Sequence, residues 1–438
     1  STNVLAQDDA ETEDESAADL GDITITGSRI SRTELEGAQA VTVITNADMS
    51  VRGYTTVFEA LNDLTQNNGF KFEGPEAQLF TPDVQTLNLR SLGVGSTLVL
   101  VNGRRLSNYP AAYQSDTTVF NFGAIPAAAV ERIEILATGA SAIYGSDAVA
   151  GVVNIILRED LDETNINLLY GEPTDASGSA GTTRIQLLTG KLFERGSISV
   201  ALEYQDRDPI LGKAYDQYDS NLDYPYADVN GPSFLDRAIL DLNWWTSFTP
   251  VDRYQDPGDG TCEGIGNGTT RSLRPGAGYY CGYDGVGEQN FRNAKEHYSA
   301  FINGQFDLTD NINVFADVLY YSGESSSNNW GIYIFEDILD TDVVVTTPFG
   351  FDFPDWYLAQ RAFTEPELGR SLDETFEDDA LTVAVGARGY WRDTHAWEVS
   401  FTHSEYELTS SRPWWKAQEV IDVFLGDYNL SLIHISEP

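Results

Sequence analysis

The side chains best suited to contact a small ligand are aromatic rings in polar, poorly periodic segments. All eight Trp residues lie after residue 240. Flat rings in such segments can stack on sugars or other ligands, and packing within the loops is the alternative role. The segment 107–120 is also polar and aromatic, as a contact loop would be. The candidates for ligand contact are Tyr109, Tyr113, Trp244, Trp245 and Trp330.

Residues for catalysis or metal binding are sparse. The four histidines show no paired metal-ligand spacing, and the motifs G-x-S-x-G, P-loop and H-E-x-x-H do not occur. The stretch 256–260 resembles a cation-binding loop only loosely and fits a simple turn better. We therefore expect no enzymatic activity, no cofactor and no bound metal.

Two cysteines, Cys262 and Cys281, lie in a Gly-rich polar stretch. They have neither metal-ligand spacing nor a C-x-x-C redox motif. One local disulfide, formed in an oxidising compartment, is the favoured interpretation. Two unrelated free thiols are the alternative.

Charge and hydrophobicity exclude two large classes of protein. The chain has 68 acidic against 26 basic residues, a net charge of −42, so nucleic-acid phosphates would be repelled. Hydrophobic residues make up 41%, yet no apolar run approaches the roughly 20 residues of a membrane-spanning helix. A helical membrane protein and a nucleic-acid partner are both excluded, and a neutral or cationic ligand is favoured.

The first thirty residues have the composition of a tether followed by a docking strand. Residues 8–22 contain eight acids and no base, so they cannot bury enough apolar surface to fold. Residues 1–21 are expected to be a signal-peptide remnant and a disordered tether. Residues 22–30 alternate β-branched side chains, which suits strand addition to a partner's sheet.

Residues 31–158 mix short helices and short strands. A capping box at Thr56 and helical spacing of apolar residues predict a helix over 56–65. Asn102-Gly103 after a buried strand is a hairpin signal. The expected strands are 97–101, 133–136 and 152–157, and Pro126 can open a short helix.

Beyond residue 160 the period changes to strict alternation in segments of about ten residues, the length of a tilted strand crossing a bilayer. Short turns alternate with two very long connections, 207–291 and 323–379, which indicates a transmembrane β-barrel and not a soluble β-sandwich. Trp391 and Trp397 flank a short turn and fit an interfacial aromatic girdle. The expected strands lie near 164–170, 182–193, 196–206, 296–308, 311–322, 380–391 and 396–409.

Three stretches within residues 22–158 resemble the plug domain of TonB-dependent outer-membrane receptors. The first, from Asp22 to Ile30, is similar to a TonB box. The second runs from Leu87 to Leu106 and departs from the plug pattern at Ser91, where Gly is frequent. The third, Ile125 to Ile156, is the most specific.

This resemblance implies a mainly β fold, with an α/β plug followed by the first strands of a barrel that closes with about 22 strands. It implies a plug that gates the lumen, no catalytic residues, and the C-terminal domain of TonB as the periplasmic partner. TonB would contact Asp22, Ile23, Thr24, Ile25 and Thr26. The plug-motif residues are Arg90, Asn102, Gly103, Arg104, Arg105, Glu131, Arg132, Glu134, Gly139, Tyr144, Gly145, Gly151 and Asn154.

The expected organisation is a plug over 31–158, a partial barrel over 159–430 and a tail over 431–438 that looks non-native. Seven strands cannot close a barrel of this family, so the chain is expected to be incomplete. The outer membrane is the expected location, with barrel strands against lipid, the N-terminus and plug on the periplasmic side, and both long connections extracellular.

Active uptake of a scarce nutrient is the expected function. The long connections carry 13 acids against 6 bases and 14 against 2, a field that would repel an anionic chelate. A neutral oligosaccharide ranks first as ligand, followed by a metal chelate or a cobalamin-like molecule. The alternatives are a passive porin or surface-binding barrel, which needs no plug, and a signal-transducing receptor, which needs an additional periplasmic domain.

Overall fold

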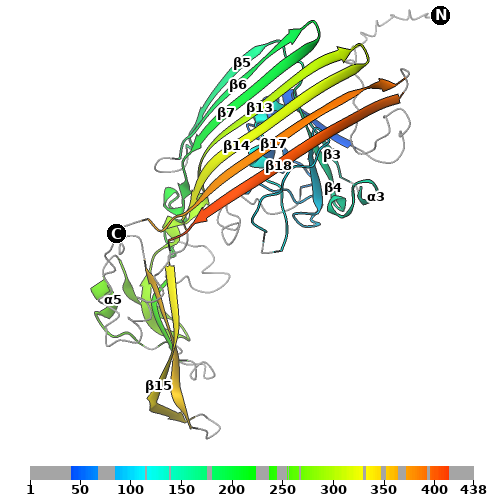
Figure 1. The fold of residues 1–438 in the computed structure, drawn as a ribbon. Coiled ribbons are helices and arrows are strands. Elements are labelled where there is room, and N and C mark those ends of the chain that lie inside the picture. Colours follow the sequence, from blue (N-terminus) through cyan, green and yellow to red (C-terminus); the bar gives the residue numbers. More distant parts are fainter. Residues whose placement is uncertain are drawn as a thin grey trace, which may run out of the picture.

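The structure is a computed structural model of the 438-residue chain. A strongly curved sheet carries a smaller mixed domain against one face, and a second group of strands extends from one end of the curved sheet (Figure 1). The structure describes residues 41–67, 84–113, 116–137, 140–174, 180–222, 236–243, 254, 256–265, 268–328, 332–346, 352–363, 371–391 and 395–413.

The smaller domain, the plug, is built on a four-stranded sheet with the order β1-β3-β4-β2. Strand β3 pairs antiparallel with β1 and β4, whereas β2 pairs parallel with β4. The strands are β1 (Val41–Thr45), β2 (Thr97–Val101), β3 (Val130–Leu136) and β4 (Gly151–Leu157).

Two short helices of the plug begin at capping boxes. Helix α1 (Asn46–Arg52) is capped by Thr45 and α2 (Val57–Asn62) by Thr56, and in both a carboxylate three residues later returns the hydrogen bond. The helix expected over 56–65 is therefore confirmed and is shorter at its end. Helix α3 (Ser141–Tyr144) and the 3-10 helices η3 (Phe122–Ala124), η4 (Ala127–Ala129) and η5 (Ser146–Ala148) complete the plug.

The hairpin expected at Asn102-Gly103 is wrong in one respect. Both residues have positive φ and the turn forms, but the partner of β2 is the distant strand β4. Side chains explain this: Asn102 Oδ1 accepts the Leu157 amide at 2.8 Å, and Asn154 Oδ1 accepts the Gly103 amide at 2.9 Å. These two bonds tie the turn to β4, so the chain leaves the sheet after it.

The curved sheet, called the wall below, has seven antiparallel strands in the order β18-β17-β14-β13-β7-β6-β5. All seven strands expected from alternation are present, several of them longer than expected. Their bounds are β5 (Thr164–Gly171), β6 (Thr182–Phe193), β7 (Gly196–Arg207), β13 (Ala294–Thr309), β14 (Ile312–Ser327), β17 (Glu374–Trp391) and β18 (His395–Ser411).

The wall has its polar face turned toward the plug and its apolar face turned outward. In β7, Ser197, Ser199 and Glu203 are buried while Ile198 and Leu202 are each 42% exposed. This is the reverse of a soluble sheet and fits strands that face lipid outside and water inside. Among the helices of the described residues, none combines the length and hydrophobicity needed to cross a bilayer.

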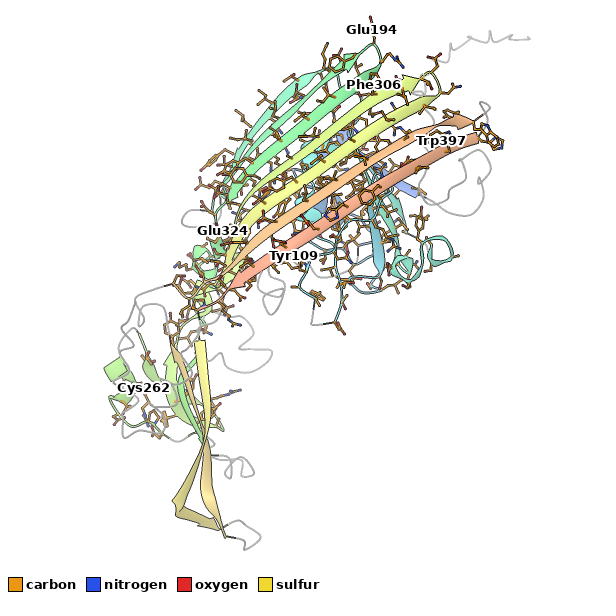
Figure 2. All side chains as sticks on the ribbon, in the orientation of Figure 1. Tyr109, Glu194, Cys262, Phe306, Glu324 and Trp397 are labelled. Atoms are coloured by element: carbon orange, nitrogen blue, oxygen red, sulfur yellow. A yellow bond between two sulfur atoms is a disulfide. The ribbon has the colours of Figure 1, made fainter. Side chains whose placement is uncertain are left out.

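Exposed aromatic side chains gather near both ends of the outward face. Phe193, Phe306, Tyr390 and Trp391 lie at the end with short turns, and Figure 2 labels Phe306 and Trp397 there. Toward the other end, Tyr204 and Tyr298 pack with ring centroids 4.9 Å apart. Two aromatic zones separated by aliphatic side chains are typical of the two membrane interfaces.

The long connections contain strands that the sequence did not indicate. Strand β9 pairs with β16, which joins the connection 207–291 to the connection 323–379 in one five-stranded sheet, β10-β11-β9-β16-β15. Paired backbone satisfies the hydrogen-bonding groups that such long loops would otherwise leave to water. The strands of the long connections are β8 (Ile210–Leu211), β9 (Asp236–Asn243), β10 (Thr270–Arg274), β11 (Gly278–Tyr283), β12 (Asn290–Arg292), β15 (Ile332–Thr346) and β16 (Asp352–Phe363), of which β8 and β12 pair with each other outside the five-stranded sheet.

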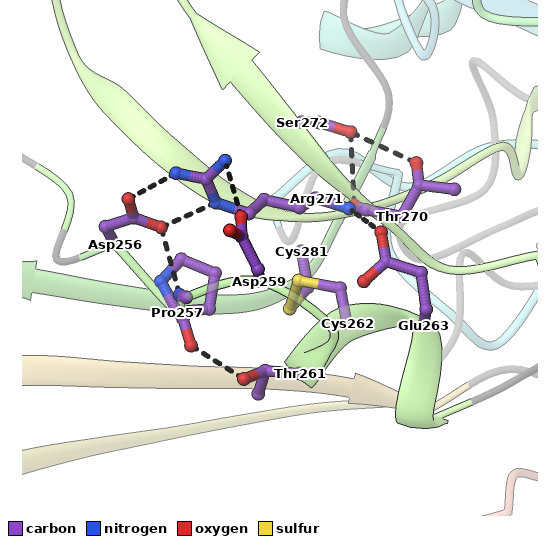
Figure 3. Close-up of a disulfide and its surroundings, with 11 residues drawn as sticks. Asp256, Pro257, Asp259, Thr261, Cys262, Glu263, Thr270, Arg271, Ser272 and Cys281 are labelled. Atoms are coloured by element: carbon purple, nitrogen blue, oxygen red, sulfur yellow. Dashed lines mark hydrogen bonds and ion pairs between the residues drawn. A yellow bond between two sulfur atoms is a disulfide. The ribbon is translucent and has the colours of Figure 1, made fainter.

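A disulfide and an ion pair stabilise one end of this outer sheet. Cys262 in helix α5 (Thr261–Ile265) is bonded to Cys281 in β11 (Figure 3). Arg271 hydrogen-bonds the Asp256 carboxylate and lowers the pKa of that carboxyl to about 2. The disulfide closes a local loop, as expected from the sequence.

Gly151 in β4 offers a test of the plug sheet. Its φ is +152°, and an added Cβ would lie 2.3 Å from the Leu136 carbonyl oxygen of β3. Gly151→Ala should therefore lower the free energy of unfolding by roughly 1–3 kcal/mol, measured by calorimetry on the full-length protein. Gly304→Ala is the control, because its Cβ would meet nothing within 4 Å. Equal transitions in the two variants would contradict the strain.

Candidate functional site: the interface between plug and wall

A small apolar patch seats the plug on the wall. Leu188, Ala201, Phe301 and Leu319 of the wall belong to the same buried cluster as the core of the plug. The 3-10 helix η4 packs here against β6 and β7. Small and apolar residues of η4 permit this close approach.

Arg104 connects the plug to two strands of the wall. Its guanidinium donates to Asp317 of β14 at 3.0 Å and to Glu398 of β18 at 2.9 Å, and it lies 4.6 Å from the centroid of the Phe315 ring. The Arg104 side chain is 15% exposed. Two carboxylates from different strands thus hold one plug cation in a half-buried position, where charge-assisted bonds are stronger than at the surface.

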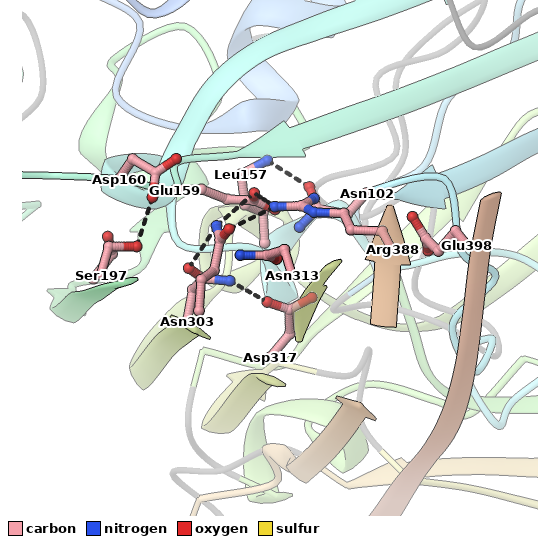
Figure 4. Close-up of polar contacts among 12 residues, drawn as sticks. Asn102, Leu157, Glu159, Asp160, Ser197, Asn303, Asn313, Asp317, Arg388 and Glu398 are labelled. Carbon is pink, nitrogen blue, oxygen red and sulfur yellow. Dashed lines mark hydrogen bonds and ion pairs between the residues drawn. The ribbon is translucent and has the colours of Figure 1, made fainter. Parts of the chain in front are cut away.

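A second polar group anchors the segment that leaves the plug. Arg388 of β17 donates to Glu159 at 2.8 Å, and Gln305 of β13 donates to the same carboxylate at 2.7 Å (Figure 4). Next to it, Asn303 donates to Asp317 at 2.6 Å. Gln305 donates to Asn303, and Asp317 also accepts from Arg104, so the two groups form one continuous network across β13, β14, β17 and β18.

Arg184 of β6 forms a third connection on the other side of the plug. It donates to the backbone carbonyl of Thr55, just before α2, and to Gln205 of β7. Nearby, Glu203 accepts from Gln186 at 2.6 Å and lies 3.4 Å from Nε2 of His297. Both Glu203 and His297 are buried, so this side of the interface is also polar.

The other charged residues of the plug motif pair within the plug. Arg105 binds Asp147 and the Tyr144 carbonyl, and its guanidinium holds the pKa of the Asp147 carboxyl below its ordinary value. Arg132 bridges Glu131 at 2.6 Å and Glu134 at 2.9 Å. These residues stabilise the plug itself, whereas Arg104 contacts the wall.

The remaining motif residues shape or hold turns of the plug backbone. Arg90 has a positive φ of 58°, and Gly145 and Gly151 also have positive φ. Asn154 is buried and holds the turn at Gly103. Gly139 lies outside the described residues.

Tyr109 and Tyr113 lie between the plug and the wall. Tyr109 is 2% exposed, and its ring packs edge-on against Tyr406 of β18 with centroids 5.5 Å apart. Tyr113 belongs to the same buried cluster and is 9% exposed. This geometry favours the alternative role of wedging the plug against the wall, because a buried ring has no face open for a ligand.

The other ligand and partner candidates cannot be placed. Trp244, Trp245 and Trp330 lie outside the described residues, as do Asp22, Ile23, Thr24, Ile25 and Thr26. Their proposed roles therefore stay predictions.

The sequence contained a signal for the wall residues that were not named as candidates. Asn303, Gln305 and Asp317 occupy the polar positions of alternating strands, which must face inward if the apolar positions face lipid. What alternation does not reveal is which inward residue meets which part of the plug. The unnamed contacts are Glu159, Arg184, Gln205, Asn303, Gln305, Asp317, Arg388 and Glu398.

Neighbouring arginines provide a matched test of the network. Arg104→Ala leaves Asp317 and Glu398 without their cation and should weaken attachment of the plug by on the order of 2 kcal/mol. Arg105→Ala removes an exposed pair within the plug and should cost about 1 kcal/mol or less. The measurement is the urea concentration at which the plug of the full-length protein becomes sensitive to protease. Equal midpoints for both variants would contradict the assignment.

Comparisons with known proteins agree with this architecture. Residues 33–152 match the family described as the TonB-dependent Receptor Plug Domain. The chain is 27% identical over 205 residues to an iron-regulated outer membrane virulence protein of Vibrio cholerae, covering 47% of this chain and 29% of that protein. It is 24% identical over 237 residues to the vitamin B12 transporter BtuB of Vibrio vulnificus, covering 52% and 36%.

Solved structures show the same fold. A mutant of the ferric enterobactin receptor from Pseudomonas aeruginosa aligns with a TM-score of 0.52 and 15% identity, covering 88% of this chain and 42% of that one. The chain thus spans about a third of the length of the curated relatives that it matches. Residues 33–152 therefore form a plug domain of the TonB-dependent receptor kind, and the chain as a whole is similar to outer-membrane receptors of that kind, with a wall that has the fold of part of their β-barrel.

Proposed function

We propose that the protein is an active transporter that takes a scarce nutrient across the bacterial outer membrane with energy delivered by TonB. The observation that carries this proposal is a folded plug fastened to the inner face of the wall by polar contacts of Arg104 and Arg388. A passive porin or a surface-binding barrel has no use for such a domain. Neither an ATP supply nor a maintained ion gradient exists at the outer membrane, so energy must come through a partner.

TonB is the partner that the family implies, and residues 22–30 are its proposed docking strand. They lie shortly before β1, which is at the edge of the plug sheet and pairs with β3 through five residues. A pull on residues 22–30 therefore reaches an edge strand first. An edge strand detaches with fewer broken hydrogen bonds than a central one, so this arrangement favours partial rearrangement of the plug over release of the whole domain.

The proposed orientation follows from the ends of the wall strands. Tight turns join β6 to β7 and β13 to β14 at one end, and both long connections leave from the other. Outer-membrane barrels have short periplasmic turns and longer extracellular loops. We place the short-turn end in the periplasm and the outer sheet outside the cell.

The ligand is proposed to be a neutral or cationic metal chelate or corrinoid. The acidic excess of the two long connections favours such a charge. The names of the relatives refer to iron, ferric enterobactin and vitamin B12, whereas nothing in these comparisons supports the oligosaccharide that the sequence ranked first. Trp244, Trp245 and Trp330 remain the proposed ring contacts.

Ile25 tests the energy coupling. Ile25→Pro in the full-length receptor removes a backbone N–H and should prevent strand pairing with TonB. Uptake of the ligand by whole cells should fall to the level of a strain without TonB, while ligand binding stays unchanged. Ile25→Val, which keeps the β-branched side chain, is the control. Normal uptake by the Pro variant would remove the proposed docking strand.

Salt dependence tests the ligand charge. Binding of neutral, cationic and anionic metal chelates and of a corrinoid to the purified receptor is compared at low and high salt. The ligand that binds should be neutral, or its affinity should fall as the salt concentration rises, because screening reduces its attraction to the acidic connections.

The same assay locates the site. Trp245→Ala should reduce affinity by on the order of 1 kcal/mol, whereas Trp391→Ala, at the short-turn end, should leave it unchanged. Tight binding of an anionic chelate alone would contradict the proposed charge, and an unaffected Trp245 variant would contradict the proposed contact.

A further inference from the structure

Two separate cavities lie between the plug and the wall and meet at one pair of residues. The inner cavity, about 500 Å³, is bordered by α1, η4 and strands β5 and β6. The outer cavity, about 180 Å³, is bordered by α2, η3 and strands β6, β7 and β13. Thr55 and Arg184 line both cavities, so the two cavities adjoin at these residues.

Both cavities are polar and large enough to hold water. A water molecule occupies about 30 Å³, and each volume exceeds that several times. Asn165, Asn167 and Gln186 line the inner cavity. The outer cavity is lined by side chains of both charges, Glu59, Glu203, Arg207, Arg292 and Lys295.

We propose that Arg184 is a gate, and that polar solutes pass between the plug and strands β5–β7 when it moves. The barrier is the bond from its guanidinium to the Thr55 carbonyl, steadied by the bond to Gln205. Thr55 precedes α2 and lies two residues after the end cap of α1 at Gly53. A shift of this plug segment breaks the barrier and joins the two cavities, while the network around Arg104 stays intact.

This inference rests on the proposed transport function, and it is tested without TonB or ligand. Ion conductance of the full-length receptor is measured in planar bilayers for Arg184→Ala, with Lys191→Ala as the control. Lys191 lies on the same strand, pairs with Asp162 at an exposed position and lines neither cavity. We expect a several-fold rise in conductance for Arg184→Ala, a smaller rise for Arg184→Lys and none for the control.

A fastening role is distinguished by the urea midpoint for protease sensitivity of the plug. A gate predicts leak in Arg184→Ala with a midpoint close to that of the parent, whereas Arg104→Ala lowers the midpoint. Leak that appears only together with a lowered midpoint, or no leak above the control, overturns the gate.

A second variant covers failure of Arg184→Ala to assemble. Gln205→Leu then decides, because it removes the side-chain acceptor of Arg184 and leaves the guanidinium in place. Leak in this variant supports the gate and its absence overturns it. Since conductance requires neither TonB nor ligand, a negative result here and normal uptake by Ile25→Pro would be separate failures.

Discussion

The lipid-facing backbone is the constraint on which the rest of the structure depends. No water is available in the hydrocarbon core, so each strand must satisfy its N–H and C=O groups on neighbouring strands. Strict pairing fixes the period of two, and the period sends apolar side chains to lipid and polar ones to the lumen. The plug therefore meets a wall whose inner face is polar, and its own surface must supply charges and amides that match.

This constraint explains what the sequence revealed. Alternation predicted seven wall strands near their observed bounds, because one face of a membrane strand must be apolar toward lipid and the other polar toward the lumen. The capping box at Thr56 is equally local, since all its bonding groups lie within three residues. The same motif at Thr45 was not recognised in the sequence. The sequence was least informative for contacts that depend on distant chain segments. Strand β2 looked like half of a hairpin, yet Asn154, about fifty residues further on, binds its turn and determines the parallel pairing with β4.

The sequence predicted which types of residue lie at the interface between plug and wall. It did not predict which residue each of them contacts. Arg104 and Arg105 are adjacent and chemically identical, yet one joins the wall and the other binds Asp147 inside the plug. Only the direction of each side chain from the turn separates them. Tyr109 was a reasonable ligand contact by composition, but the register of β18 places Tyr406 against its ring. Strands β9 and β16 were missed because neighbouring connections supply each other's partner, which no single segment encodes.

The distribution of apolar and polar contacts at the interface suits a domain that must be held and also moved. The apolar patch around Leu188, Ala201, Phe301 and Leu319 is small and gives the plug one seating position. Most other contacts are hydrogen bonds and ion pairs, whose groups can exchange protein partners for water at modest net cost. A wholly apolar interface would expose its full surface to water as soon as the plug shifted. Polar cavities large enough to hold water lie on both sides of Arg184, so groups of the segment around Thr55 can exchange protein partners for water when that segment moves.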